Sequence, residues 1–558
     1  MKIIILLALL ISTFAPAAAA RTATADLILV NGRVWTADPA QHWVWGVAIK
    51  NGAVIARGTD AAIKRFAGKA TAIEDLGGRF AMPGINDSHT HFLSASLGMF
   101  QVDLTDARNL KDAQDLIVKF ATENPDAPWI IGRGWQYTIF PGGLPKRQDI
   151  DAVIADRPVY MRAYDGHTSW ANSKTLEIAG VTKDTKFEGF GEIVRDADGV
   201  PTGVFKEGAS SLISRRLPPV TRQQQLRALD VGMKYAASLG ITSIQNAHGG
   251  PDEAMLYADV LARKALTVKT KFAFSVGPET TQADIDRIAA FSTAHKSPEL
   301  SVGAIKIMVD GVIESYTAAM LAPYANKPET SGTPNFSVDQ LNRVVAMADK
   351  AGLQIYIHAI GDRGVRMALD AFENAIRVNG RRDSRFRIEH IETIDPADIP
   401  RFKELGVIAS MEPIHADPAT IDVWSAAIGK DRTSRGFAWR ALERAGARLI
   451  FSSDMPAAIT MSPWRGLHNA VNRQTTGLLP VGGWLPEHRV SVETALRAYT
   501  ANGAFASFEE NRKGMIAVGH AADLIVLDAD PFRINPKDLF RINVVRTIFD
   551  GKTIYRKP

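Results

Sequence analysis

The chain has 558 residues, of which 46% are hydrophobic and 22% are charged, and these proportions exclude a disordered or fibrous protein. It contains no cysteine, which excludes disulfides, thiolate zinc sites, iron–sulfur clusters and cysteine nucleophiles. The formal net charge of +5, from 65 basic and 60 acidic residues, is too small an excess over this length to build a nucleic-acid-binding surface.

Residues 1–20 have the layout of a secretory signal peptide. Lys2 supplies the positive charge, residues 3–14 are apolar, and the three alanines at 18–20 form a small-residue cleavage site. The apolar stretch is shorter than the roughly 20 residues that a membrane-spanning helix needs. We therefore expect this segment to be removed, and the mature protein to be secreted into the bacterial periplasm without a membrane anchor.

Both ends of the remaining chain carry short apolar-alternating runs separated by turns. Near the N-terminus these are residues 25–34 and 45–56, and near the C-terminus 522–527 and 544–555. Two separate β patches would each leave exposed sheet edges. We therefore predict one small β-sandwich, built from residues 21–78 and 511–558 together.

Between these ends, at residues 79–510, strand-like apolar runs alternate with amphipathic segments, which predicts βαβ units and a parallel sheet. The eight candidate strands are residues 80–86, 242–246, 268–275, 302–309, 353–358, 385–389, 407–411 and 448–452. Eight units predict an α/β fold of the (β/α)8 TIM-barrel type. The first interval is too long for one crossover, so residues from about 100 to 230 are predicted to form an inserted subdomain.

Polar residues with metal-binding side chains follow several of these strands. His89 and His91 come after the first run, and on an extended strand residues i and i+2 project to the same side, so both imidazoles can reach one metal ion. The other candidates lie at the carboxyl ends of later strands, where barrel enzymes carry their catalytic groups. They are Lys306, His358, His390 and Asp454.

The order His-x-His, Lys, His, His, Asp resembles the amidohydrolase superfamily, whose members are metal-dependent hydrolases on a (β/α)8 barrel. Longer phrases resemble its amidohydrolase-3, YtcJ-like branch, which includes N-substituted formamide deformylases; they include MPGINDSHTHF, DGHTSWANSKTLEIAGV, IHAIGDRG, RIEHIET and FSSDMP. The resemblance covers the whole mature chain. It implies hydrolysis of a non-peptide C–N bond in a small-molecule amide, N-substituted formamide or cyclic amide.

The resemblance also implies a divalent metal centre with one or two ions. His89, His91 and Asp454 would hold the more buried ion, and His358 and His390 the second. Zn²⁺ suits these ligands, but manganese, iron or cobalt would fit them too. A protonated lysine has no lone pair, so Lys306 could bridge two ions only after carbamylation by CO₂. Two alternatives stay open, an ordinary ion pair of Lys306 with Asp310, and Glu207 of the insertion as the bridging carboxylate.

The expected chemistry follows from the positive charge of the bound metal ion. A bound divalent ion lowers the pKa of its water from 15.7 to about 7, and Asp454 is the expected general base, which returns the proton to the leaving nitrogen. Its alternative role is to cap the following helix. His167, in DGHTSW, would donate to the substrate carbonyl or serve as a structural histidine.

Other candidates receive weaker roles from the sequence. Glu389 is expected on the opposite face of its strand from His390 and so outside the site. His248 is a possible contact of the site, and His415 has no motif around it and is expected to pack or face solvent. Metal ligands alone do not separate an amidase from an esterase, lactonase or deaminase, or from an inactive binding protein, and the oligomeric state stays open.

Overall fold

The computed structural model describes residues 24–558, so the predicted signal peptide lies outside the described residues. Its centre is an eight-stranded sheet in the order β21-β20-β19-β18-β17-β16-β15-β8, with every neighbouring pair parallel. The strands are β8 (Ile85–Thr90), β15 (Ile241–Asn246), β16 (Lys269–Ser275), β17 (Leu300–Met308), β18 (Gln354–Ala359), β19 (Arg387–His390), β20 (Ile408–Met411) and β21 (Arg448–Phe451). This is the predicted barrel.

The barrel closes next to the predicted metal site. The first and last strands, β8 and β21, are joined just beyond their carboxyl ends, where the backbone N–H of Asp454 donates to the carbonyl of His89 at 2.8 Å. The Ser453 N–H also donates to the Asp87 carboxylate, at 2.8 Å. Two candidate metal ligands from opposite ends of the barrel sequence are therefore fixed side by side by the backbone itself.

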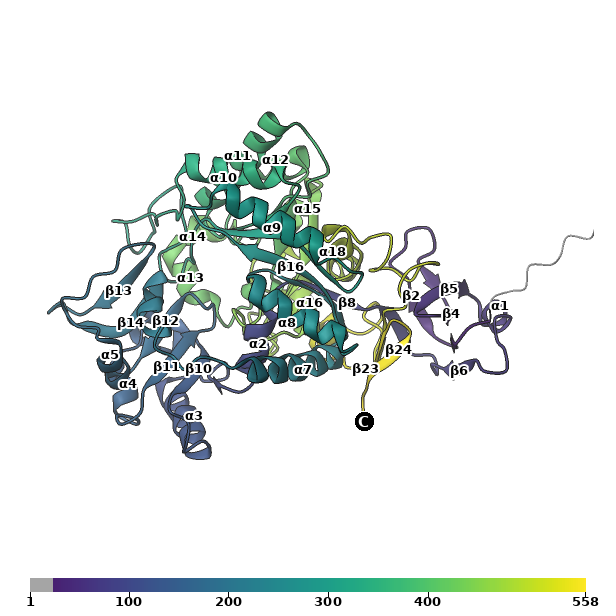
Figure 1. Cartoon of the computed structure of the whole chain (residues 1–558), viewed down its shortest axis with the longest axis horizontal. Helices are drawn as coiled ribbons and strands as arrows, with labels where there is room; N and C mark the ends of the chain where they lie inside the picture. Colours follow the sequence, from purple (N-terminus) through teal and green to yellow (C-terminus); the bar gives the residue numbers. More distant parts are fainter. Residues whose placement is uncertain (1–23) are drawn as a thin grey trace, which may run out of the picture.

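Helices cover the outside of the barrel, as the sequence pattern predicted (Figure 1). In α10 (Val338–Lys350) the Ser337 hydroxyl accepts from the backbone of Gln340, whose side chain caps in return. Leu341, Val344, Val345 and Ala348 form its buried stripe at helical spacing. The other principal cover helices are α7 (Arg222–Ser238), α8 (Pro251–Ala262), α9 (Gln282–Ala294), α11 (Asp362–Asn379) and α12 (Ile399–Leu405).

The first predicted strand, at residues 80–86, is wrong as a single strand. It is two strands in different sheets: β7 (Phe80–Pro83) pairs with β22 (Leu524–Leu527), whereas β8 starts at Ile85 and pairs with β15. Gly84 divides them, and a Cβ there would lie 2.2 Å from Thr242 Oγ1. A continuous apolar run does not show such a change of partner, because both halves are buried.

Strands from the two chain ends build one unit, as predicted (Figure 1). A six-stranded sheet has the order β24-β23-β22-β7-β2-β3, and a four-stranded sheet the order β5-β4-β1-β6. Leu29, Val47, Leu524 and Ile548 belong to the core that the two sheets share. The remaining strands are β1 (Leu27–Val30), β2 (Arg33–Trp35), β3 (Trp43–Val44), β4 (Gly46–Lys50), β5 (Ala53–Gly58), β6 (Ala72–Asp75), β23 (Val544–Phe549) and β24 (Lys552–Arg556).

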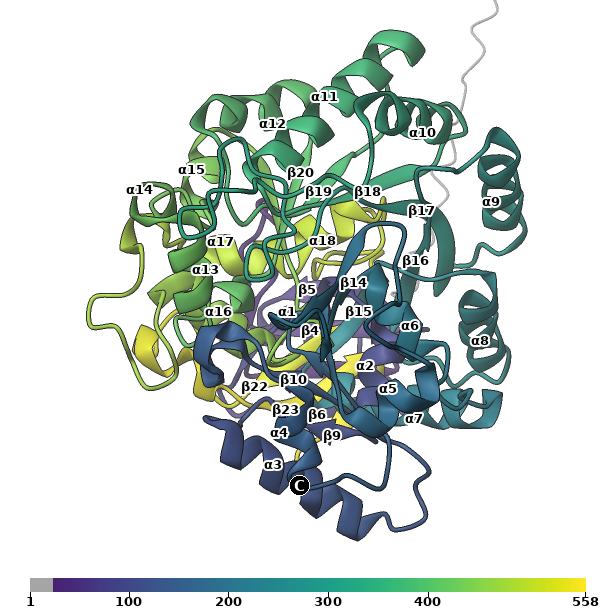
Figure 2. The same ribbon diagram turned by 90° about the vertical axis from the view of Figure 1, so that its left-hand side faces the viewer.

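The predicted insertion between β8 and β15 forms a six-stranded sheet, β13-β14-β12-β11-β10-β9, with α3 (Leu110–Glu123) and its own buried core. Figure 2 views the molecule from the side where this subdomain lies. The strands are β9 (Val102–Asp103), β10 (Ile130–Trp135), β11 (Val159–Ala163), β12 (Thr168–Ala171), β13 (Gly191–Arg195) and β14 (Pro201–Glu207). None of the helices described in residues 24–558 is long and apolar enough to cross a bilayer.

Candidate metal centre

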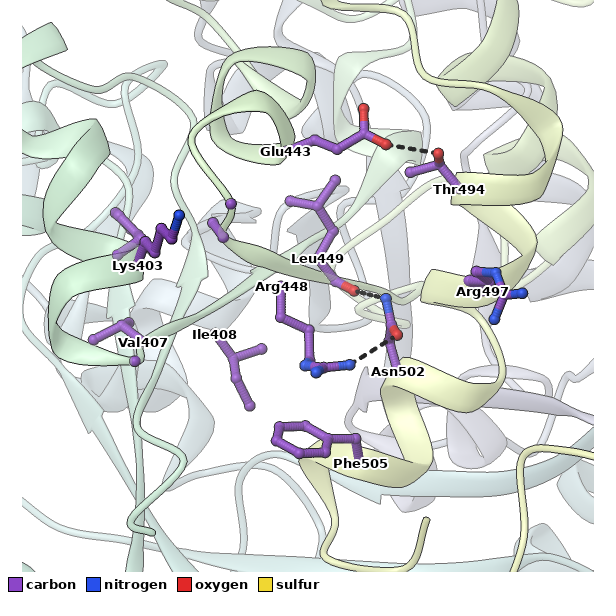
Figure 3. Close-up of a pocket in the computed structure, with 14 residues that line it drawn as sticks. Lys403, Val407, Ile408, Glu443, Arg448, Leu449, Thr494, Arg497, Asn502 and Phe505 are labelled. Carbon is purple, nitrogen blue, oxygen red and sulfur yellow. Dashed lines mark hydrogen bonds between the residues drawn. The ribbon is translucent and has the colours of Figure 1, made fainter. Parts of the chain in front are cut away.

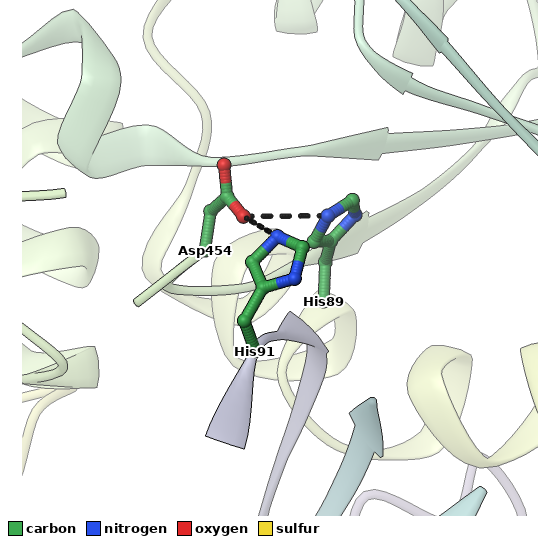
Figure 4. Close-up of side chains that lie close together, drawn as sticks. All are labelled: His89, His91 and Asp454. Carbon is green, nitrogen blue, oxygen red and sulfur yellow. Dashed lines mark ion pairs between the residues drawn. The ribbon is translucent and has the colours of Figure 1, made fainter. Parts of the chain in front are cut away.

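Three predicted ligands meet where the barrel closes. Nε2 of His91 lies 3.1 Å from Oδ1 of Asp454, and Nε2 of His89 lies 3.3 Å from the same oxygen (Figure 4). This oxygen is buried and, among the described residues, has no hydrogen-bond partner. Buried polar atoms are nearly always paired, and two imidazole nitrogens and a carboxylate are ligands that zinc prefers. The arrangement therefore fits a divalent cation.

Two buried carboxylates orient the imidazoles of this centre. Nδ1 of His89 lies 2.5 Å from Glu389, and Nδ1 of His390 lies 2.8 Å from Glu412. An ionised carboxylate can only accept, so beside Glu389 the ring of His89 carries its proton on Nδ1 and its lone pair on Nε2. Arg387 holds Glu389 in turn by two hydrogen bonds, at 2.5 and 2.8 Å. A carboxylate behind a histidine is the usual support of a metal-binding imidazole.

The expectation that Glu389 lies outside the site is wrong, since it is fully buried against His89. The alternation of side chains between the two faces of β19 stops at this point, because His390 has φ +76° and Ile391 has φ +50°. Glu389 and His390 can therefore both reach the barrel interior. Arg387 is two residues before Glu389, on the same face, and this charged pair in an apolar strand was a sequence signal for an interior ion pair.

His415 was expected to pack or face solvent, and the structure corrects this. Its Nε2 lies 3.7 Å from Oδ2 of Asp454, and its ring stacks on His390 at a centroid distance of 5.8 Å. His390, His415 and Asp454 form a second group whose ligand atoms lie within 4.8 Å of one another. His415 is four residues beyond β20, so its place in the sequence already indicated a position at the barrel rim. Sequence reasoning missed it because no motif surrounds it.

His358 lies beside these groups without being part of them. Its ring is 4.5 Å from that of His390, and its Nε2 is 3.2 Å from the carbonyl of Gly311 and 3.6 Å from Asp310. The compact His, Asp and Glu groups found in residues 24–558 do not include it. Its role as a ligand of a second ion stays a prediction.

Lys306 projects into the centre, where its Nζ lies 3.2 Å from Nε2 of His89. It is 3% exposed, and burial, which disfavours an ammonium, lowers its pKa. The alternative ion pair with Asp310 is wrong, because that carboxylate instead accepts three backbone N–H groups, from Ala319, Ile360 and Gly361. Within residues 24–558 Lys306 has no carboxylate at ion-pair distance.

His167 and Glu207 come from the insertion and form a pair. Nδ1 of His167 lies 2.8 Å from Oε2 of Glu207, and the Thr317 hydroxyl donates to Oε1 at 2.6 Å. The side chain of Glu207 is therefore buried, and it supports His167. Burial alone would lower the pKa of His167, but Glu207 outweighs this and raises it to about 9. Its ring lies 5.3 Å from that of His358.

The protonation states also fit a cation site. Burial holds the pKa of His89 well below its usual value and lowers that of His390 to about 3, so both imidazoles are neutral. Burial opposes ionisation of Asp454, but the adjacent His89 and His91 outweigh it and hold its pKa well below the usual range. Neutral imidazole and ionised carboxylate are the forms that bind metal. Asp454 does not cap the following helix α16 (Pro463–Asn472), which Ser462 caps instead.

A small cavity opens onto this centre. Its wall comes from the insertion and from the loops after the barrel strands, so it joins the two parts of the fold. The lining includes Tyr164, Asp165, His167, Val312, Glu314, His358, Ile360, His390, Glu392, His415, Asp454 and Ala457. A small molecule in this cavity would contact Asp454 and His167 together.

A larger cavity lies elsewhere (Figure 3). It is lined by Ile408 and Arg448, the first residues of β20 and β21, together with Lys403 and Asn502. These are the amino ends of the strands, opposite the metal centre. Barrel enzymes place catalysis at the carboxyl ends, so this cavity is not the candidate site.

Sequence and structure comparisons agree with this geometry. The sequence model of the Amidohydrolase family matches residues 72–555. "Protein LONG AFTER FAR-RED 3" of Arabidopsis thaliana is 32% identical over 95% of this chain and 92% of its own length. "Putative amidohydrolase YtcJ" of Bacillus subtilis is 29% identical (92% and 96%), and "N-substituted formamide deformylase" of Arthrobacter pascens is 27% identical (95% and 98%).

A comparison with solved structures also finds a metal-dependent hydrolase. An uncharacterised metal-dependent hydrolase from Pyrococcus furiosus superposes with a TM-score of 0.70 and 26% identity, over 91% of this chain and all of that one. The family match covers most of the chain, and buried imidazoles meet a carboxylate where the barrel closes. The chain therefore belongs to the Amidohydrolase family, in its YtcJ-like branch, and is a metal-dependent hydrolase.

Proposed function

We propose that this protein hydrolyses a C–N bond other than a peptide bond in a small-molecule amide, and that N-substituted formamides and cyclic amides belong to its substrate range. The observation that carries the proposal is the unpaired Oδ1 of Asp454, which faces the Nε2 atoms of His89 and His91 beside a cavity. The similarity to an N-substituted formamide deformylase over 95% of the chain supports the choice of bond.

His89, His91 and Asp454 would hold the catalytic ion, with His390 or His358 available for a second. His415 is less suited, because burial would lower its pKa but Glu392 outweighs this and raises it to about 10, which keeps the ring protonated. When bound, a divalent ion such as Zn²⁺ would polarise the carbonyl and lower the pKa of a water to about 7. Asp454 is ionised, so it can accept the proton of the attacking water and deliver it to the leaving nitrogen. Its position between the imidazoles and the cavity suits both transfers.

His167, which also lines the cavity, would support the reaction. With a pKa of about 9 it is protonated at neutral pH, and Glu207 fixes its ring through Nδ1. The other ring nitrogen then donates to the carbonyl oxygen and stabilises the negative charge that develops there. The insertion would in this way contribute a catalytic group to the barrel.

We also propose that Lys306 is carbamylated. Its neutral Nζ would add to the carbon of CO₂ and lose one proton, which gives an anionic carbamate beside His89. Burial without a carboxylate partner favours this neutral amine. Mass spectrometry of the intact protein should show the gain of one carboxyl group, and Lys306→Arg should lack it.

The bond type is tested with metal-depleted protein reloaded with Zn²⁺, Mn²⁺ or Co²⁺. N-substituted formamides and acyl amines are compared with esters of the same acyl and alkyl groups. We expect metal-dependent amide turnover that chelation abolishes. Faster ester than amide hydrolysis across the series would contradict the proposal and indicate an esterase on the same centre.

We further propose that the protein is exported and that its N-terminal segment is removed after about residue 20. The charge, apolar run and alanines of residues 1–20 carry this proposal. N-terminal sequencing of the protein from the periplasmic fraction of an expressing bacterium should begin near Arg21. Recovery from the cytoplasm with Met1 intact would contradict it.

A further inference from the structure

Glu314 is a buried carboxylate in the wall of the catalytic cavity, and no positively charged side chain of the described residues pairs with it. It follows β17, is 9% exposed, and its Oε1 accepts a hydrogen bond of 2.8 Å from the Tyr164 phenol. Across residues 24–558 it forms no ion pair with a lysine, arginine or histidine. A buried charge without a partner is costly, and its position suggests that the partner is a ligand.

The two neighbouring carboxylates of the cavity have polar partners within the protein. Asp165 accepts from the Tyr137 hydroxyl at 2.7 Å and from the backbone of His167 at 2.9 Å. Glu392 accepts from the Trp424 indole at 2.8 Å and lies 3.5 Å from Nδ1 of His415. Burial and the charges of Glu392 and Asp165 raise the pKa of Glu314 to about 8, so the group is largely protonated at neutral pH without a cation beside it, and a bound cation would favour the carboxylate.

The same cavity reaches the candidate metal centre, where the amide of a substrate would react. Asp454 lines it as well, is 4% exposed, and has the unpaired buried Oδ1 described above. Val312, Ile360 and Ala457 supply apolar wall between the polar groups. A molecule that presents its amide to Asp454 therefore occupies the same enclosed space as the carboxylate of Glu314.

We propose that Glu314 binds a cationic nitrogen of the substrate, so that the substrate class is amides that also carry an ammonium or guanidinium group. This inference rests on the proposed amidohydrolase function and narrows it. A charge-assisted hydrogen bond in a buried cavity is about twice as strong as one between neutral groups. Tyr164 fixes one oxygen of the carboxylate and leaves the other for the substrate.

Two formamides of matched shape test the proposal. N-formyl-1,4-diaminobutane carries an ammonium where N-formylpentylamine carries a methyl group. We expect kcat/KM of the Zn²⁺-loaded wild type to be at least about tenfold higher for the cationic compound. Glu314→Gln should remove this preference, Glu314→Asp should retain part of it, and Glu329→Gln, on an exposed loop, should match the wild type.

A wild type that prefers the neutral compound, or a folded Glu314→Gln that keeps the wild-type preference, would overturn the inference. If neither formamide is hydrolysed, the proposed hydrolysis of formamides is contradicted independently of Glu314. Calorimetric binding then tests whether Glu314 forms a cation site. Pentylammonium should then bind the wild type at least about tenfold more tightly than 1-pentanol, with the difference lost in Glu314→Gln. Equal binding of the two probes would overturn the assignment of a cation site.

Discussion

Nδ1 of His89 donates a hydrogen bond to Glu389, a residue 300 positions later in the chain, at 2.5 Å. The bond links the first strand of the barrel, β8, to the sixth, β19, and it leaves the lone pair of His89 directed at Asp454. Glu389 is held in turn by Arg387. Orientation of the metal ligand therefore depends on a residue that does not contact the metal position.

Glu389→Gln should lower metal affinity by about 10–100-fold, the usual effect of losing such a support. The amide has only one acceptor oxygen and no charge, so its NH₂ group would face an N–H donor either of Arg387 or of His89, and the support of the ring is weakened. Competition with a chromophoric chelator measures the affinity. Glu123→Gln, on the exposed face of α3, is the matched control, and unchanged affinity in Glu389→Gln would contradict this role.

Asp454→Asn should keep the fold and at least some bound metal, but lower kcat by about 10²–10⁴-fold, since the amide cannot accept the water proton. Metal content, circular dichroism and turnover are measured on the same preparation. Wild-type turnover in this variant would remove Asp454 from the mechanism, and complete loss of metal would show that it acts mainly as a ligand.

The barrel and its rim residues could be predicted from the sequence because each depends on a local pattern. Strand-like runs alternate with helices, and His89, His91, Lys306, His358 and Asp454 lie at strand ends. The chain-end sheets followed from the same local alternation. A local sequence pattern is thus sufficient to predict a residue's role when that role depends only on the residue's position in one strand or helix.

The supporting residues could not be predicted in this way. The role of Glu389 depends on contact between β19 and β8 and on the positive φ of His390, neither of which strand periodicity shows. His415 lies in a short turn, Pro413–Ala416, beyond its strand. Glu314 becomes part of the cavity only because the insertion places Tyr164 against it.

A stability prediction concerns the junction between the barrel and the chain-end sheets. Nζ of Lys269, at the start of β16, lies 2.8 Å from Asp523 and 2.7 Å from Asp550, and its side chain is 3% exposed. Lys269→Met should destabilise the protein by about 3–5 kcal/mol, because it leaves a buried carboxylate without its cation. Lys111→Met, which breaks an exposed ion pair on α3, should cost no more than about 0.5 kcal/mol.

Urea unfolding followed by circular dichroism measures both effects as shifts of the transition midpoint. The Lys269→Met midpoint should fall well below that of the wild type, and the Lys111→Met midpoint should stay close to it. Equal midpoints for the two variants would show that the buried pair contributes no more than the exposed one.

His167 gives a pH dependence with a definite sign. Its pKa is raised to about 9 in the folded protein and is about 6.5 when unfolded, so folding favours the protonated ring. This contribution is fully present below about pH 6.5 and is lost as the pH rises through 9, and it amounts to about 3 kcal/mol at most. Urea midpoints of metal-free wild type and His167→Gln should therefore differ most at low pH and converge above pH 9. A difference that grows with pH would mean that Glu207 does not stabilise the imidazolium.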